Sequence, residues 1–411
     1  MSVHIIPLSG AGCGAIAVLA RTVGYTACMI GHEEILDRQD RARSATEQAR
    51  FDALLVVGRS FYDRPGDLAY LTNHFPPFPS TVFTGEHRGL GHGFLLLPVA
   101  GDPTLITDPR KHRTDLVPIA DVRASTNLGA TVIDLLRERG LERGRIAVAS
   151  DDIMPAPIDR EIRAALPGLT LEPQGEIVSS LRRIKSVAEQ AALRRAAEAA
   201  DAALTAAVKQ IQTGRATERD ACAAGIHAAM ANGADFVRYM RVHSGPWSSM
   251  GSRWPQSTDR QIVRGDLIVL DAIGAVEGYQ FDVNRSLSCG PTDAERMRLL
   301  ETVHDAVTVA VESCRAGSRV RDVVSAARSV IDRSPFANAF GGMMGHGIGL
   351  ETVEEPLLTP ENDMVLEPGM VLCVEPGLFV PNWGGALIEQ EVIIGEDGPP
   401  EVITRTPVRL W

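Results

Sequence analysis

Four acidic side chains with related spacing stand out in the second half of the sequence. Asp271 and Glu375 each end a short apolar run, six positions after a glycine. A second acid follows each of them, Asp282 in one case and Glu389 in the other. Burying a carboxylate costs several kcal/mol unless a positive group meets it, and the basic residue nearest in sequence is Arg285. The four acids therefore indicate a bound cation.

The two acid pairs belong to an internal repeat. Gly214–Asp220 and Gly317–Asp322 each end one helical pattern and begin another, and their first glycines lie 103 residues apart. Asp271 and Glu375 lie 104 residues apart. This nearly constant offset predicts two copies of one helix-helix-hairpin unit.

The hairpin registers follow if the two acids of each pair face one another. The first turn would then be centred on Val276–Glu277, and the second on Asn382 beside Pro381 and Gly384. Turn residues are dense at the second position. Opposed residues on antiparallel strands share a face and lie about 5 Å apart, so we expect each hairpin to present two carboxylates to one point.

His346 is a fifth candidate ligand, and the glycines on either side of it leave room for close backbone approach. One imidazole with four carboxylates suits Mn, Fe, Co or Zn rather than a thiolate site. Four carboxylates would over-neutralise a single divalent ion, whereas two bridged ions balance better and serve hydrolytic chemistry. Each acid taken singly is also compatible with a strand-end salt bridge, but the symmetric spacing favours a shared metal centre.

This pattern resembles the pita-bread metallopeptidases, which include methionine aminopeptidase, aminopeptidase P, prolidase and creatinase. The family's ligand order of Asp, Asp, His, Glu, Glu falls on Asp271, Asp282, His346, Glu375 and Glu389. The segment Leu181–Glu189 is similar to the helix that opens the catalytic domain in the aminopeptidase P, prolidase and creatinase group. The resemblance covers roughly residues 50–405 and implies two ions (Mn, Co, Zn or Fe) with a metal-bridging hydroxide as nucleophile. It also implies that Glu375 is both ligand and general base.

Several positions depart from the family pattern. Val353 and Gly342 stand where proline-specific members carry histidines, Ser244–Trp254 lacks a third, and Leu387 replaces an arginine. An imidazole there would pass protons and polarise a carbonyl, so we expect weak activity on Xaa-Pro peptides. His243 is the nearest candidate catalytic substitute, with an ordinary strand-end histidine as the alternative.

Candidate substrate-binding residues surround the same segment. Trp247 and Trp254 flank the expected pocket mouth and would form an apolar wall or one for a cationic substrate, or pack at a domain interface. Val353 would face the substrate in place of the family's histidine. Three arginines could bind a substrate carboxylate or instead lie at a solvated strand end: Arg238, Arg241 and Arg253.

The sequence before the catalytic domain predicts a separate α/β domain. Short apolar strands are expected at 52–58, 93–98 and 145–150, with a helix at 130–139. Gly89–Gly93 precedes a strand and lacks a P-loop lysine, so we interpret it as a turn. A capping-box pattern at Ser186 and Glu189 predicts a helix start, and Gly214 a helix end.

We therefore predict a fold of α/β and α+β type, with a small amino-terminal α/β domain followed by a pseudo-twofold pita-bread catalytic domain. The expected division is an extension of unassigned role at residues 1–35, a creatinase/prolidase-like domain at 36–175 and the metal-binding catalytic domain at 176–411.

Composition restricts the environment and partners. The 41 basic and 52 acidic residues give a net charge of −11, which disfavours nucleic acid and anionic membranes as partners. Six cysteines without C-x-x-C spacing indicate reduced thiols and a cytoplasmic protein. No apolar run approaches the roughly 20 residues of a membrane helix, and the apolar first 35 residues lack a basic leader. Relatives of this two-domain type predict a homodimer.

The leading hypothesis is a dinuclear-metal hydrolase, metallopeptidase-like, acting on a small amide or short peptide substrate. The alternative is a non-peptidase lyase, because Ser244–Trp254 and Leu366–Glu375 resemble a dimethylsulfoniopropionate lyase of this fold. That enzyme carries an extra metal-binding Asp where this chain has Ile273. Another small-molecule C–N hydrolase also remains open, whereas five intact ligands disfavour a binding protein on a degenerate fold.

Overall fold

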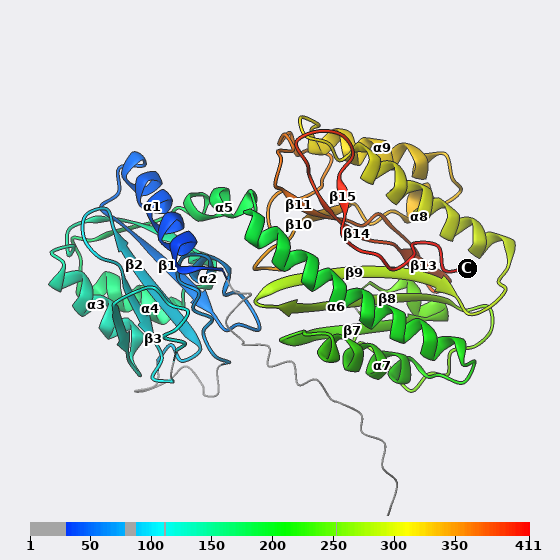
Figure 1. Cartoon of the computed structure of the whole chain (residues 1–411), viewed down its shortest axis with the longest axis horizontal. Helices are drawn as coiled ribbons and strands as arrows, with labels where there is room; N and C mark the ends of the chain where they lie inside the picture. The colour runs from blue at the N-terminus through cyan, green and yellow to red at the C-terminus, as the bar shows by residue number, and fades with distance from the viewer. Residues whose placement is uncertain (1–29, 79–87, 111, 252) are drawn as a thin grey trace, which may run out of the picture.

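The computed structural model describes residues 30–78, 88–110, 112–251 and 253–411. Residues 1–29, most of the extension expected at 1–35, lie outside this part of the chain. Figure 1 shows two groups of elements, one around a mixed sheet and one in which helix pairs flank further strands. No helix among the described residues is long and apolar enough to cross a membrane.

The first group surrounds a six-stranded sheet with strand order β4-β3-β2-β1-β5-β6. Its strands are β1 (Ala53–Arg59), β2 (His92–Pro98), β3 (Thr104–Thr107), β4 (Asp121–Ala124), β5 (Arg145–Ala149) and β6 (Thr170–Pro173). Its helices are α1 (His32–Gln48), α2 (Gly66–Thr72), α3 (Leu128–Glu138) and α4 (Ala156–Ala165). Strand β1 is apolar on both faces because Leu54 packs with α1 and α2, while Leu55 packs with α3 and α4.

The elements expected in this region are confirmed within one or two residues at each end. Strands β1, β2 and β5 and helix α3 coincide with the four predicted ranges. Gly89 and Gly91 both have φ of 86° in a turn that leads into β2, as predicted for a turn rather than a phosphate loop. We keep the proposed division at residues 175 and 176, which falls between β6 and the next helix.

The second group begins with helices that run along its strands. Helix α5 (Glu176–Arg183) leads to α6 (Val187–Gln212), whose start is fixed by the predicted capping box between Ser186 and Glu189. Gly214 follows the end of α6 with φ of 71°. Helix α7 (Glu218–Ala231) completes the first helix pair, and α8 (Ala294–Ser313) with α9 (Val320–Asp332) forms the second. The helix-helix-strand order therefore occurs twice, as the repeat predicted.

The strands of this group form three sheets between the helix pairs (Figure 1). One contains β7 (Phe236–Ser244), β8 (Leu267–Val276) and β9 (Tyr279–Ser288). Another contains β10 (Gly345–Gly347), β11 (Val371–Val374), β14 (Gln390–Ile393) and β15 (Glu401–Val402). The third is the hairpin of β12 (Gly377–Val380) and β13 (Gly384–Leu387). Apolar side chains of α6 and α7 pack with β7–β9, and those of α8 and α9 pack with the other two sheets.

The register predicted for the first hairpin is wrong, because its turn lies one residue further along the chain than predicted. Asp271 lies opposite Asn284, and Asp282 lies opposite Ile273. The two-residue turn falls on Glu277 and Gly278, with φ of 54° and 80°, because this turn needs left-handed backbone that a β-branched valine resists. The slip amounts to two residues, so both acids still lie on one face of the sheet.

The register predicted for the second hairpin is confirmed. Gly377 pairs with Leu387, and Cys373 pairs with Glu391, so both pairs are centred on Asn382. Asn382 has φ of 61°, a left-handed conformation that asparagine tolerates. The same register places the two glutamates of this half opposite one another.

Candidate metal centre

One face of the β7–β9 sheet carries three adjacent rows of side chains. In the central row Arg241 of β7 lies beside Asp271 of β8, which lies beside Asn284 of β9. The row toward the turn holds Tyr239, Ile273 and Asp282, and the row on the other side holds His243, Val269 and Ser286. Because side chains alternate along a strand, residues two apart share this face. The two aspartates therefore lie on adjacent strands, one row apart.

The second half of the repeat brings its own side chains to this face. His346 lies on β10, Glu375 follows β11, and Glu389 precedes β14. His346 Nε2 is 3.3 Å from Glu375 Oε1 and 3.8 Å from Asp282 Oδ2. Glu389 Oε2 accepts a hydrogen bond of 2.5 Å from Asn284 Nδ2. The structure therefore brings together all five side chains that the sequence proposed as ligands.

The carboxylates repel one another in a buried environment. Burial raises the pKa of Asp271 to about 6; the neighbouring Arg241 opposes this rise and Glu375 adds to it. Burial, with repulsion from neighbouring acids, raises the pKa values of Asp282 and Glu389 well above their usual range. Such a cluster is stabilised when a cation replaces the lost water.

The protein atoms leave ligand positions open at this cluster. Among the described residues, Asp271 Oδ1 and Glu389 Oε1 are buried and accept no hydrogen bond. His346 Nδ1 lies 2.9 Å from the Gly347 carbonyl, which can only accept, so Nδ1 carries a proton and Nε2, which faces the acids, is the nitrogen available to a metal ion. Carboxylate oxygens and one imidazole nitrogen form a donor set for hard or borderline divalent ions. The residues present therefore fit the expected metal centre.

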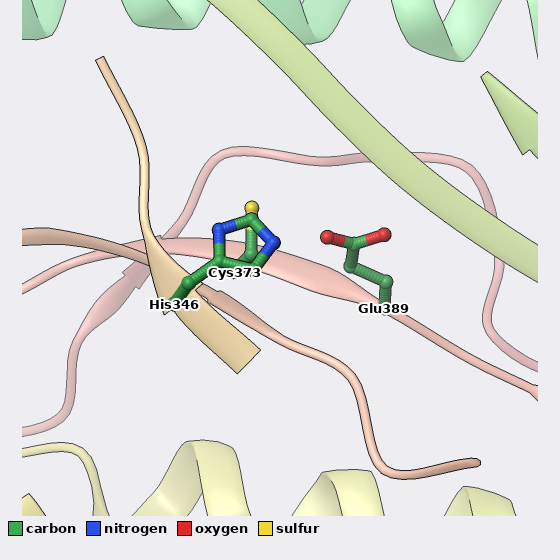
Figure 2. Close-up of side chains that lie close together, drawn as sticks. All are labelled: His346, Cys373 and Glu389. Atoms are coloured by element: carbon green, nitrogen blue, oxygen red, sulfur yellow. The ribbon is translucent and has the colours of Figure 1, made fainter. Parts of the chain in front are cut away.

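Cys373, two residues before Glu375, also lies beside the cluster. It pairs with His346 across β10 and β11, and potential ligand atoms of these two residues and Glu389 lie within 4.8 Å of one another. Figure 2 shows the thiol beside the imidazole, with the Glu389 carboxylate facing both. Burial and the surrounding carboxylates raise the pKa of the Cys373 thiol well above its usual range. The carboxylates of this cluster outnumber its single thiol, so the oxygen-rich assignment is retained.

The positive charge beside the acids comes from a different residue than the sequence suggested. Arg285 is fully buried and donates to the backbone carbonyls of Asn284, Glu389 and Thr406, not to the acid side chains. The cation at the cluster is Arg241, whose Nη2 lies 2.8 Å from Asp271 Oδ2. Cross-strand pairing, not sequence proximity, determines which arginine meets the acid.

Sequence reasoning also missed two polar residues that hold the acids. Asn284 orients Glu389, and Glu391 accepts a hydrogen bond of 2.9 Å from the backbone N–H of Asp282. Burial raises the pKa of Glu391 to about 8. The sequence signal for both is their position. Asn284 follows the proposed ligand Asp282 by two residues, and Glu391 follows the proposed ligand Glu389 by two residues.

The remaining candidates occupy varied positions, and their roles stay predictions. His243 is buried, and burial with the nearby Arg253 lowers its pKa to about 4, so it is neutral near pH 7. Arg253 is buried and pairs with Glu218 at 2.6 Å, so it does not lie at a solvated strand end. Trp247 and Trp254 are exposed.

Two positions at which the family carries histidines, Val353 and Gly342, are open to solvent. Val353 is 50% exposed and lines a cavity of about 340 Å³ with Arg64, Asp67 and Arg182, among others. Gly342 is also exposed. Leu387 on β13 is half-buried, and its backbone N–H donates to Ser286 Oγ.

Comparison with known proteins gives consistent matches over both groups of elements. Residues 191–396 match metallopeptidase family M24, and residues 38–184 match the creatinase/prolidase N-terminal domain. The chain is 33% identical to a probable dipeptidase, PepE, of Mycobacterium tuberculosis over 317 residues, covering 75% of this chain and 82% of that protein. It is 31% identical to an Xaa-Pro dipeptidase of Pyrococcus horikoshii over 237 residues, covering 57% of this chain and 66% of that protein, just under two thirds. The crystal structure of a prolidase from Pyrococcus horikoshii superposes with a TM-score of 0.79 at 24% identity, covering 91% of this chain and 100% of that one, which shows a shared fold.

Proposed function

Because the chain belongs to metallopeptidase family M24 and is a metal-dependent hydrolase, we propose that it cleaves an amide bond in short peptides or peptide-like small molecules. The relatives described above include dipeptidases, which supports a substrate of this size. The reaction would use two divalent ions, Mn, Co, Zn or Fe, held by Asp271, Asp282, His346, Glu375 and Glu389.

The observation that carries this proposal is the pair of buried, unpartnered carboxylate oxygens on Asp271 and Glu389. Two divalent ions bound there would lower the pKa of water and polarise the substrate carbonyl. Glu375 has the most exposed of the four carboxylates, with a side chain 17% exposed, so its oxygens can accept a proton from the attacking water. His346 Nε2 lies 3.3 Å from Glu375 Oε1, so these two side chains would hold the same ion.

Other residues would act on the substrate. His243 Nε2 is buried without a hydrogen-bond partner among the described residues. Burial and the nearby Arg253 lower its pKa to about 4, so the neutral imidazole can accept a hydrogen bond from the substrate but is a weak base. We keep it as a proposed catalytic group. Trp247, Trp254 and Val353 remain proposed substrate contacts, and all three side chains are exposed. Arg253 remains one in spite of its ion pair with Glu218.

The experiment compares metal content and hydrolysis in matched variants. Chelated full-length protein is reloaded with Mn²⁺ or Co²⁺ and assayed on dipeptides, Xaa-Pro peptides, simple amides and a sulfonium compound. Asp282→Asn and Glu389→Gln should lose metal and at least about 100-fold in activity. Asp305→Asn is the control, because the exposed Asp305 belongs to a separate acid-histidine cluster, and this variant should retain both metal and activity.

The outcomes separate the alternatives. Hydrolysis by metal-free protein, or full metal content in Asp282→Asn, would contradict the proposal. Elimination from the sulfonium compound without amide hydrolysis would replace the hydrolase with the lyase.

Homodimer formation and a cytoplasmic location remain proposals. Cys222, Cys289, Cys314 and Cys373, the cysteines in the described ranges, are unpaired, which supports a reducing compartment. Sedimentation that shows only monomer at micromolar concentration would contradict the dimer.

A further inference from the structure

An arginine side chain lies in the row of side chains that carries a proposed metal ligand. Arg241 is opposite Asp271 across β7 and β8, and its Nη2 lies 2.8 Å from Asp271 Oδ2. The Arg241 side chain is 16% exposed, whereas that of Asp271 is 5% exposed. The guanidinium donates to the Tyr239 hydroxyl, and its Nε is buried without a hydrogen-bond partner among the described residues. Arg241 therefore keeps donor capacity beside the proposed ligands.

The other two arginines that the sequence suggested for a substrate carboxylate are engaged elsewhere. Arg253 pairs with the buried Glu218 at 2.6 Å. Arg238 lies over the ring of Tyr62, which follows β1 in the amino-terminal group of elements, at 5.7 Å from the ring centre. Within the described part of the chain, Arg241 is the one of the three that forms an ion pair with a proposed metal ligand.

Arg285, the other arginine beside the carboxylates, is inaccessible to a substrate. It is fully buried, and its guanidinium donates to backbone carbonyls and to Gln390 Oε1. Burial lowers its pKa to about 10, and Asp201 is the foremost of the acids that oppose this change. Arg285 therefore supports the backbone around the cluster, which leaves Arg241 as the arginine that a substrate can reach.

We propose that Arg241 binds a carboxylate of the substrate next to the bond that is cleaved. This inference rests on the proposed function and narrows its substrates to small amides that carry a carboxylate close to the scissile bond. Asp271 would share its negative charge with a bound ion, and the other partner of the guanidinium, the Tyr239 hydroxyl, is neutral. A buried cation is costly without an anion, and a carboxylate supplies both the charge and strong hydrogen bonds.

The spacing of atoms within a dipeptide suits this arrangement. Three bonds separate the carbonyl carbon of its peptide bond from the carboxylate carbon, so these two atoms lie about 3–4 Å apart. Arg241 Nη2 lies 2.8 Å from an oxygen of a proposed metal ligand. A substrate whose carbonyl reaches the ligands can therefore bring its carboxylate to the guanidinium, whereas a neutral amide has no group for this contact.

The test is calorimetric titration of the Mn²⁺-loaded full-length protein with two compounds that cannot be hydrolysed. One is the ketomethylene analogue of alanyl-alanine, in which a CH₂ group replaces the peptide N–H, and the other is its carboxy-terminal amide. Wild type should bind the carboxylate at least about tenfold more tightly than the amide, the lower limit for hydrogen bonds between charged groups. In Arg241→Gln with verified metal content, this ratio should fall below about threefold, because glutamine is neutral.

Arg110→Gln is the matched control. Arg110 pairs at 2.5 Å with Asp108, whose side chain is fully buried, and this pair follows β3 in the amino-terminal group of elements. The control therefore also removes the cation from a buried aspartate, but far from the proposed ligands in the fold (Figure 1). It should keep the ratio of wild type. A general loss of stability or of metal affinity would weaken both compounds alike and leave the ratio unchanged.

The results distinguish this inference from the function on which it rests. A wild-type ratio below about tenfold, or no binding of either compound, would overturn the inference even if Arg241→Gln does not fold. A ratio above about threefold in folded Arg241→Gln would overturn it as well. In these cases metal-dependent hydrolysis of other substrates would stand. If the Mn²⁺-loaded wild type hydrolyses none of the peptides and amides named under the proposed function, that function fails and the inference fails with it.

Discussion

Arg182 joins the amino-terminal group of elements to the loop that follows the proposed metal ligand on β10. Its Nη1 lies 2.6 Å from Asp67 Oδ1, and its Nη2 lies 2.5 Å from Glu354 Oε1. All three side chains are less than a tenth exposed. The backbone of Glu354 exchanges two hydrogen bonds with Gly347, the residue after His346. The ion pairs of Arg182 therefore fix the loop beside a proposed ligand.

Arg182→Met should lower the free energy of unfolding by about 3–5 kcal/mol, because it leaves buried carboxylates without their cation. Lys185 still pairs with Glu354 at 3.0 Å, which favours the lower end of this range. Arg183→Met is a control at the next position. Within the described part of the chain Arg183 pairs only with Glu176, whose side chain is 70% exposed, so its loss should cost less than about 1 kcal/mol.

Equilibrium urea denaturation of the two variants, after metal has been removed with a chelator, measures the difference between their losses in unfolding free energy. We expect Arg182→Met also to weaken Mn²⁺ binding, since the loop next to His346 loses its anchor, while Arg183→Met should bind as wild type does. Losses in stability that agree within about 1 kcal/mol would refute the reasoning, because the buried network would then stabilise no more than a surface pair.

Three further predictions address the metal centre, pH and substrate. Asn284→Ala should weaken Mn²⁺ binding about 10–100-fold, because Asn284 orients Glu389; titration that gives the wild-type affinity would count against this role. Burial, with the nearby His112, lowers the pKa of His74 from 6.5 to about 4, so only the unfolded chain gains a proton there between pH 6.5 and 4. The free energy of unfolding should fall by up to about 3 kcal/mol as pH falls through this window. Denaturation curves of His74→Gln should show a smaller fall. The same pH dependence in this variant as in wild type would disprove the assignment. Wild type should cleave Xaa-Pro dipeptides with kcat/KM below about 10⁴ M⁻¹s⁻¹, and Val353→His should raise it about tenfold; an efficient wild type would show that the absent histidines are not needed.

The grouping of the five proposed ligands was predictable because it follows from short sequence motifs and their repeat. Each hairpin carries its acids at strand positions whose neighbours are apolar, and the repeat places the two hairpins equivalently. The second hairpin was also predictable in register, since Asn382 tolerates left-handed backbone and lies beside Pro381 and Gly384, which are common in turns. The first was not, because Val276 and Gly278 stand one on each side of Glu277 and only the backbone angles decide between two turns.

The surroundings of the acids were not predictable, because they depend on pairing between distant strands. Arg241 precedes Asp271 by thirty residues, yet the β7–β8 register makes them direct neighbours. Asn284 lies in the same segment as Asp282 but serves Glu389 from the other half of the repeat. Nothing in local composition distinguishes these residues from ordinary strand polar residues.

The most direct test is the position of bound metal in crystals of the Mn²⁺-loaded protein, measured by anomalous scattering. Two peaks are predicted, both among Asp271, Asp282, His346, Glu375 and Glu389. An absence of peaks among these residues, or a peak only at the exposed cluster of Glu301, His304 and Asp305, would contradict the proposed metal centre.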